Sequence, residues 1–299
     1  MRRAAERAYR AQAQLLAGAR AQATLPRLVL SVVLIVIVLL VLTGTVNRAL
    51  LAIDPVFWRA QLGGAGNTPL SLLVLLLQFG ALIVAVWLVV LAVHGRRLWD
   101  MIGPFAQTCA QFWAVFRLLA LIVALVWVLP PYDMEQPVVR NMEFGRWLML
   151  LPFGLAALLV QVSAEEILFR GHLQQTLAAR FSHPLVWTLI PSALFALGHY
   201  MPSEAGDNAQ LYVLWAFVFG LLMADLTARS GTLGPAIAVH LINNCTALLL
   251  VSLPDNMSGL ALYVAPYEMA DTEALRRWLG VDFAFMIVCW LGARLAVRA

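Results

Sequence analysis

The sequence has little charge and no lysine. Only 12% of its 299 residues are charged, whereas 62% are hydrophobic, and the mean hydropathy is +0.84. So few charges cannot cover a surface in contact with water, so a soluble globular protein is excluded. All 20 basic residues are arginines at helix ends or in the first 27 residues, where phospholipid headgroups favour them, so nucleic acid is not indicated as a partner.

Cysteine is also scarce. Cys109, Cys245 and Cys289 are odd in number and lie in or near apolar segments. They show neither a disulfide framework nor metal-ligand spacing. Strands that alternate polar and apolar residues are missing too, since the apolar runs are continuous, which excludes an outer-membrane barrel.

What the chain does have is long apolar runs. Runs of this length predict transmembrane helices, because about 20 apolar residues span a bilayer. We expect helices at 28–46, 69–93, 112–130, 147–169, 184–200, 211–228, 232–252 and 281–297. The predicted fold is therefore an all-α, polytopic membrane bundle of about eight helices. The loops near 47–68, 131–146 and 253–280 are too short for a separate soluble domain.

The charge distribution predicts the domains and the orientation. Residues 1–27 form a basic arm, expected to be a surface helix, and residues 28–299 form the membrane domain, with its functional core at about 147–252. Loops with arginine alternate with acidic loops. The acidic residues of these loops are Asp133, Glu135, Glu204, Asp207, Asp255, Glu268, Asp271 and Glu273. The positive-inside rule then places both termini in the cytoplasm and the protein in the cytoplasmic membrane.

Polar side chains inside the apolar runs are the functional candidates. An ionisable group in a bilayer costs about 3 kcal/mol or more, so it needs a partner or a function. Three helices carry such groups, namely Glu165, Glu166 and Arg170, then His199 after Phe195, and finally His240 with Asn243 and Asn244.

Helix geometry predicts which of these groups meet. Glu165 and His199 lie equally far, about 25 Å, from a turn near residues 181–184, so they share one level. His240 lies about 14 Å from the turn at Gly231, and the levels agree if the first hairpin projects further into the cytoplasm. His240 and Asn244, four residues apart, share a face.

The same geometry separates the two acids. Adjacent residues point about 100° apart, so we expect that Glu165 and Glu166 do not face one partner. Glu166 and Arg170 have the spacing of an intrahelical ion pair, which leaves Glu165 facing the cavity. Asp225 and Arg229 have the same spacing and are expected to pair.

Two further histidines receive a structural interpretation. His172 and His183 are expected at the level of the lipid headgroups.

Three motifs together carry a family resemblance. Glu165-Glu166-x-x-x-Arg170, Phe195-x-x-x-His199 and His240-x-x-x-Asn244 follow in that order, with a turn, Arg229 to Pro235, before the third. They resemble the motifs of the CPBP family, the CAAX-protease and bacteriocin-processing intramembrane endopeptidases. The resemblance covers about residues 150–250.

The resemblance implies a function and roles for these residues. It implies a helical bundle whose polar cavity opens toward the cytoplasm and which cuts peptide bonds near the membrane face. By motif position, Glu165 would be the general base, His199 its partner, and His240 with Asn244 the group that holds the oxyanion. Glu166, Arg170 and Phe195 would support them.

The choice between a metal-free and a metal mechanism stays open at this point. No cofactor is expected, but His199, His240 and Glu165 are together a set of zinc ligands that leaves a position for water. The chain lacks His-Glu-x-x-His. The family has carried both a metalloprotease label and a metal-free glutamate interpretation.

The predicted function is hydrolysis of a peptide bond in a membrane-associated protein or peptide, with the lipid bilayer as the second partner. The leading alternative is a non-catalytic membrane scaffold or bacteriocin-immunity protein that binds a partner through the same cavity. A transporter with Glu165 as proton carrier is the third hypothesis.

Overall fold

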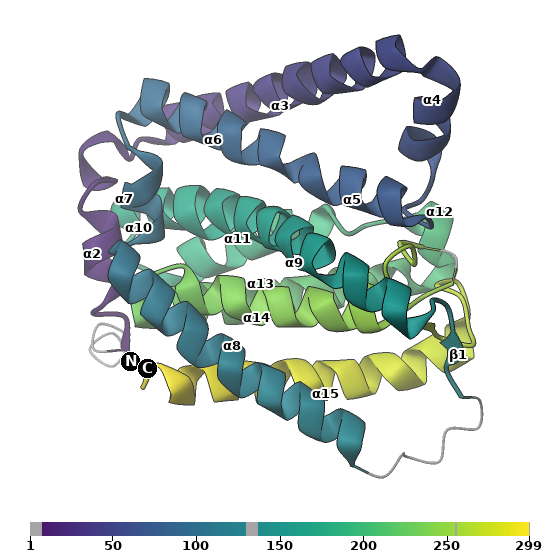
Figure 1. Ribbon diagram of the computed structural model, residues 1–299. Helices are drawn as coiled ribbons and strands as arrows, with labels where there is room; N and C mark the ends of the chain where they lie inside the picture. Colours follow the sequence, from purple (N-terminus) through teal and green to yellow (C-terminus); the bar gives the residue numbers. More distant parts are fainter. Residues whose placement is uncertain (1–7, 130–136, 255, 299) are drawn as a thin grey trace.

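The computed structural model describes residues 8–129, 137–254 and 256–298. Three predicted acidic loop positions (Asp133, Glu135 and Asp255) and the first arginines of the arm (Arg2, Arg3 and Arg7) lie outside these ranges. The described chain is an all-α bundle, and both of its ends lie at the same end of the bundle (Figure 1).

Apolar helices occupy the eight predicted positions. They are α3 (Leu25–Ile53), α5 (Pro69–Leu77) with α6 (Phe79–His94), α8 (Phe105–Val128), α9 (Phe144–Glu166), α11 (Pro184–Leu197), α13 (Ala209–Ser230), α14 (Gly234–Cys245) and α15 (Thr272–Ala296). By length and composition, six of the helical stretches in the described chain are sufficient to cross a membrane, while Pro184–Leu197 and Gly234–Leu250 are shorter. The prediction of a polytopic helical bundle is confirmed.

Two of these helices continue as π-helix. The first continuation follows α9 and leads into α10, so that one helical stretch runs from Phe144 to Arg180 over 37 residues. The second follows α14. The π segments and α10 are η2 (Ile167–Gln174), α10 (Gln175–Arg180) and η4 (Thr246–Leu250). Such π turns widen the helix and frequently occur at functional sites.

Short elements close the two ends of the bundle. They are α2 (Gln12–Leu16), η1 (Arg20–Gln22), α4 (Pro55–Gly63), α7 (Leu98–Ile102), α12 (Pro202–Ala205) and η3 (Gly206–Asn208). The remaining elements are the strands β1 (Val139–Arg140), β2 (Val251–Ser252) and β3 (Tyr263–Val264). In this sheet, which the sequence did not predict, β3 is central, antiparallel to β1 and parallel to β2.

The basic arm differs from the expected surface helix. Its described part contains only the five-residue α2 and the turn η1, and Leu15, Leu16 and Ala19 are buried. Gln14 donates a hydrogen bond to the carbonyl of Gly231, and Arg96 donates one to the carbonyl of Leu15. The arm therefore packs under the helix ends, because its apolar residues find partners there.

Local sequence explains the turn that positions α14. Gly231 ends α13 with φ +72°, in the left-handed region that glycine adopts without strain. A proline then stands in the first turn of α14, where its missing N–H costs nothing. The chain reverses here within a few residues.

The core consists of two large apolar clusters that meet at α14. One cluster centres on α5, α6 and α9 and includes Leu72, Val86 and Leu158. The other centres on α8, α11, α13 and α15 and includes Leu119 and Met223. Because residues of α14 belong to both clusters, this short helix is buried over most of its length and its polar side chains are enclosed.

Candidate active site

Helices α9 and α14 bring two acids and a histidine together. The Nδ1 atom of His240 lies 2.8 Å from Oε1 of Glu166, and its Nε2 atom lies 3.4 Å from Oε2 of Glu165. The side chains are 5% exposed for His240, 14% for Glu165 and 0% for Glu166. Three ionisable groups thus share one small volume inside an apolar bundle.

This arrangement corrects the expected separation of the two acids. Both carboxylates face His240, because the two ring nitrogens lie on different edges of the imidazole and each reaches a different acid. A carboxylate held by an arginine accepts hydrogen bonds only, so Nδ1 of His240 carries the proton that it shares with Glu166. The other ring nitrogen, Nε2, is directed toward Glu165.

Arg170 neutralises Glu166 and ties a third helix to the site. Its Nη1 atom is 3.0 Å from Oε1 of Glu166, which confirms the predicted pair, and its Nη2 atom donates to the carbonyl of Gly220 in α13. The guanidinium also lies 4.9 Å from the ring centroid of Phe195 in α11. The arginine is 1% exposed and compensates the charge of a fully buried carboxylate.

Gly220 allows this contact because α11 and α13 pack closely there. A Cβ atom at Gly220 would lie 2.9 Å from Cβ of Ser192. The absence of a side chain therefore positions the carbonyl that Arg170 binds.

His199 is placed next to the cluster through Phe195. The two rings are 4.6 Å apart, and the ring of Phe195 is 6.0 Å from that of His240, so both histidines pack near the same phenylalanine. Nδ1 of His199 lies 2.9 Å from the carbonyl oxygen of Phe195. Because a carbonyl can only accept, Nδ1 of His199 carries a proton, and in the neutral imidazole Nε2 is then the acceptor.

Asn244 lies one helical turn beyond His240 and bonds to a residue that sequence reasoning missed. Its Nδ2 atom donates to Oε1 of Gln161 at 2.8 Å. Its Oδ1 atom accepts from Nδ2 of the adjacent Asn243 at 3.2 Å. A signal was present, since Gln161 precedes Glu165 by four residues on an apolar helix and therefore shares its face.

The expected level of His172, near the lipid headgroups, stays a prediction, but its side chain does not face the lipid. His172 is fully buried, its Nε2 atom is 2.8 Å from the hydroxyl of Ser31, and its ring lies 5.1 Å from that of His94. It is buried because α3 and α6 cover the helical stretch beyond the site. His183 is exposed, as expected, and its Nδ1 atom accepts from the amide of Leu185 at the start of α11.

The three predicted metal ligands do not form one group. Within the described ranges, no three side chains of histidine, cysteine, aspartate and glutamate are grouped as metal ligands. His240 directs one ring nitrogen to each acid, and the ring of His199 packs against Phe195. The residues therefore do not fit the metal-bound arrangement in this conformation.

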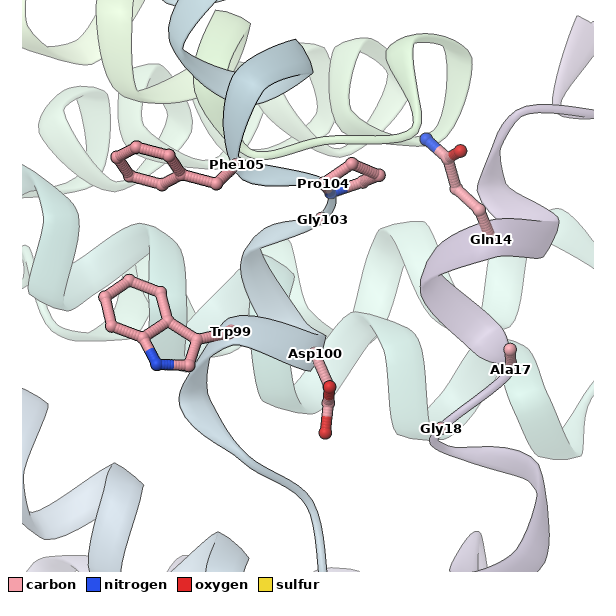
Figure 2. A pocket seen from close by; sticks show the side chains of 8 residues that line it. All are labelled: Gln14, Ala17, Gly18, Trp99, Asp100, Gly103, Pro104 and Phe105. Carbon is pink, nitrogen blue, oxygen red and sulfur yellow. The ribbon is translucent and has the colours of Figure 1, made fainter.

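A cavity of about 720 Å³ lies at the end of the bundle that carries the termini. Figure 2 shows Trp99 and Phe105 on one side of it and Gln14 and Ala17 on the other, with Asp100 between them. Its lining contains a single acid and no histidine. It lacks the acid and base pair of the α9 and α14 seam, so we do not take it as the candidate active site.

Comparison with known proteins confirms the resemblance over the middle of the chain. Residues 147–246 match the model of a family described as type II CAAX prenyl endopeptidase Rce1-like, which is consistent with the CPBP family. The uncharacterized protein YyaK of Bacillus subtilis (strain 168) is 26% identical over 181 residues, which are 58% of this chain. The match spans 59% of that relative's length. No solved structure matches the chain.

The matched segment contains every residue of the three motifs. It begins in α9 and ends at the start of η4, so it also includes Gln161 and Gly220. The Rce1-like family is a family of proteases. The site geometry above therefore lies in a segment that matches the Rce1-like family model, within a multi-pass membrane protein.

Proposed function

We propose that the protein is an intramembrane endopeptidase that hydrolyses a peptide bond of a membrane-associated protein or peptide. One observation carries the proposal: Glu165, Glu166 and His240 converge between α9 and α14, buried in an apolar bundle. Polar groups at such depth are costly, and these lie in the segment that matches the model of a peptidase family.

Glu165 is the proposed general base. Its Oε2 atom is buried and has no hydrogen-bond partner among the described residues, so it is available to accept a proton from a water molecule. Nε2 of His199, an acceptor, would hold the same water. The water oxygen then forms a bond to the carbonyl carbon while its proton moves to Glu165.

Asn244 and His240 are the proposed stabilisers of the oxyanion. Asn244 has a second N–H on Nδ2 besides the one that Gln161 binds. His240 contributes through Nε2, which faces the carboxyl group that takes the proton from the water and so lies next to the reacting atoms. Collapse of the intermediate breaks the C–N bond, and Glu165 passes the proton that it took from the water to the leaving amine.

The orientation is part of the proposal. The ends of the described chain lie together, and the segment that begins there carries Arg10, Arg20 and Arg27, so we place this end in the cytoplasm and the protein in the cytoplasmic membrane. Reporter enzymes that are active on one side of the membrane only, fused to the C-terminus, test this. A periplasmic C-terminus would contradict it.

The decisive experiment is proteolysis of a library of quenched fluorescent peptides by the purified full chain in detergent. We expect cleavage by the wild type and a loss of about 10²- to 10⁴-fold in kcat/KM for Glu165→Gln, the usual contribution of a general base. Glu143→Gln, the same change at an exposed position just before the same helix, is the matched control and is expected to keep full activity.

One outcome would overturn the proposal, and another would overturn its metal-free mechanism. Equal inertness of wild type and Glu165→Gln across the library would favour the scaffold or immunity-protein reading. Activity that chelator abolishes and zinc restores would instead replace the metal-free mechanism with the one that uses His199, His240 and Glu165 as ligands.

A further inference from the structure

We propose that Gln161 is a positioning residue that fixes which end of the Asn244 side chain faces the reacting carbonyl. The inference rests on the proposed function, because it concerns the oxyanion donor of that reaction. Gln161 is 7% exposed, and its Oε1 atom accepts the hydrogen bond from Nδ2 of Asn244 at 2.8 Å. It belongs to none of the three motifs.

Gln161 and Asn244 form the second of two cross-links between α9 and α14. Glu165 and Glu166 contact His240, and one turn away Gln161 contacts Asn244. The residue number falls along α9 as it rises along α14, so the two helices run antiparallel. A residue four positions before the base therefore lies beside the residue four positions after His240.

The carboxamide of Asn244 has two ends of similar shape and opposite chemistry. Its NH₂ group donates hydrogen bonds, whereas its oxygen accepts them. A side chain turned by 180° would direct Oδ1 at the oxyanion and repel it. The orientation of this amide thus decides between stabilisation and repulsion of the same transition state.

Two bonds hold the orientation that the structure shows. Oε1 of Gln161 accepts only from the NH₂ end of Asn244, and Nδ2 of Asn243 donates only to its oxygen end. Of the two residues that bond to Asn244, Gln161 is buried, so water does not readily replace it as the hydrogen-bond partner, while Asn243 is half-buried. We therefore assign the main control of the orientation to Gln161.

The test is a double-mutant cycle on the full chain in detergent. Gln161→Met keeps the approximate shape and removes the acceptor. We expect a fall in kcat of about 10- to 100-fold, part of what one oxyanion donor contributes, with KM changed less than about 3-fold. The variant Gln161→Met/Asn244→Ala should be no slower than Asn244→Ala alone, because Gln161 acts only through Asn244.

Gln174→Met is the matched control. Gln174 is also buried, at 0% exposure, on the same helical stretch, and it donates to the carbonyl of Ala224 rather than to a site residue. Its loss should lower stability about as much as that of Gln161 while kcat stays within about 2-fold. If Gln161→Met does not fold, Gln161→Ala, which lacks the acceptor without its bulk, replaces it in the same cycle.

The outcomes separate this inference from the proposed function. Cleavage by the wild type together with a normal kcat in the Gln161 variants overturns the inference and leaves the peptidase intact. Losses that add in the double variant overturn it as well, since Gln161 would then act independently of Asn244. A wild type that cleaves no peptide overturns the proposed function, and the inference falls with it.

Discussion

Two ion pairs with the same four-residue spacing lie in very different surroundings. Glu166 and Arg170 meet at 3.0 Å with side chains 0% and 1% exposed, while Asp225 and Arg229 meet at 2.8 Å with side chains 16% and 20% exposed. Both pairs follow from the intrahelical rule and both are confirmed. Spacing alone therefore predicts that a pair forms, and burial decides what the pair does.

Their further partners differ as much as their burial. Glu166 and Arg170 bind His240, the carbonyl of Gly220 and the ring of Phe195, so the pair connects four helices at the candidate site. Asp225 and Arg229 are joined by other groups at the bundle end, namely the hydroxyl of Tyr9, its ring and the indole N–H of Trp290. The first pair organises a histidine, and the second fastens the arm.

The largest expected difference is in stability. Arg170→Met leaves a buried carboxylate uncompensated and should destabilise the protein by about 3–5 kcal/mol. Arg229→Met, at the partly exposed pair, should cost about 1 kcal/mol or less. Unfolding by SDS in mixed micelles measures both. The double variant Glu166→Gln/Arg170→Met should recover part of the loss, and no recovery would mean that the arginine acts by packing alone.

The second comparison concerns activity. Glu166→Gln removes the charge that fixes the proton on Nδ1 of His240, and we expect kcat/KM to fall by about 10- to 100-fold, the range for a partner that orients a functional histidine. Asp225→Asn makes the same type of change at the other pair and should leave kcat/KM within about 2-fold. Peptide cleavage by the two purified variants measures both values. Equal kcat/KM for the two variants would contradict the different roles that we assign to the two pairs.

Glycines near each pair give a third comparison. A Cβ at Gly220 would lie 3.0 Å from Cα of Ser192, so Gly220→Ala should push α11 away from α13. We expect the variant to lose about 1–3 kcal/mol of stability and to lose activity as well. Gly231→Ala strains a left-handed residue and pushes against the carbonyl of Ala11, at a similar cost. Limited proteolysis should show a released arm only for Gly231→Ala, with cleavage activity retained.

The smallest expected effect is a pH dependence of stability at Tyr9, which bonds to the partly exposed pair. Burial, aided by the charge of Asp225, raises the pKa of Tyr9 to about 12. The unfolded chain loses the phenol proton near pH 10, so this stabilisation is complete below pH 10 and is lost as the pH rises toward 12. Tyr9→Phe should remove this fall in the free energy of unfolding with rising pH. The fall amounts to less than about 1 kcal/mol for a half-buried group. Unfolding measured between pH 9 and 11 tests this.

The sequence predicted the apolar architecture well. A continuous apolar run indicates a membrane helix without any knowledge of what the helix packs against, so all eight positions were found. Gly231 marked the tight turn before α14. The motif residues Glu165, His240 and Asn244 were predicted to lie on two facing helices, and these helices do pack together. Their catalytic roles stay predictions.

What the sequence did not predict depends on contacts between distant segments. That both acids face His240 follows from the rotation of α14 against α9, which helix periodicity leaves undetermined. The burial of His172 depends on Ser31, 141 residues away. The small sheet pairs two-residue strands from separate loops, too short to leave a periodic signal.

The arm also sets an order of events during synthesis. Tyr9 bonds to Asp225 and Gln14 to the carbonyl of Gly231, across 216 and 217 residues respectively. These partners emerge from the ribosome only after most of the membrane helices have been made. The first part of the described chain is therefore among the last to find its native contacts, and its docking closes the assembled bundle.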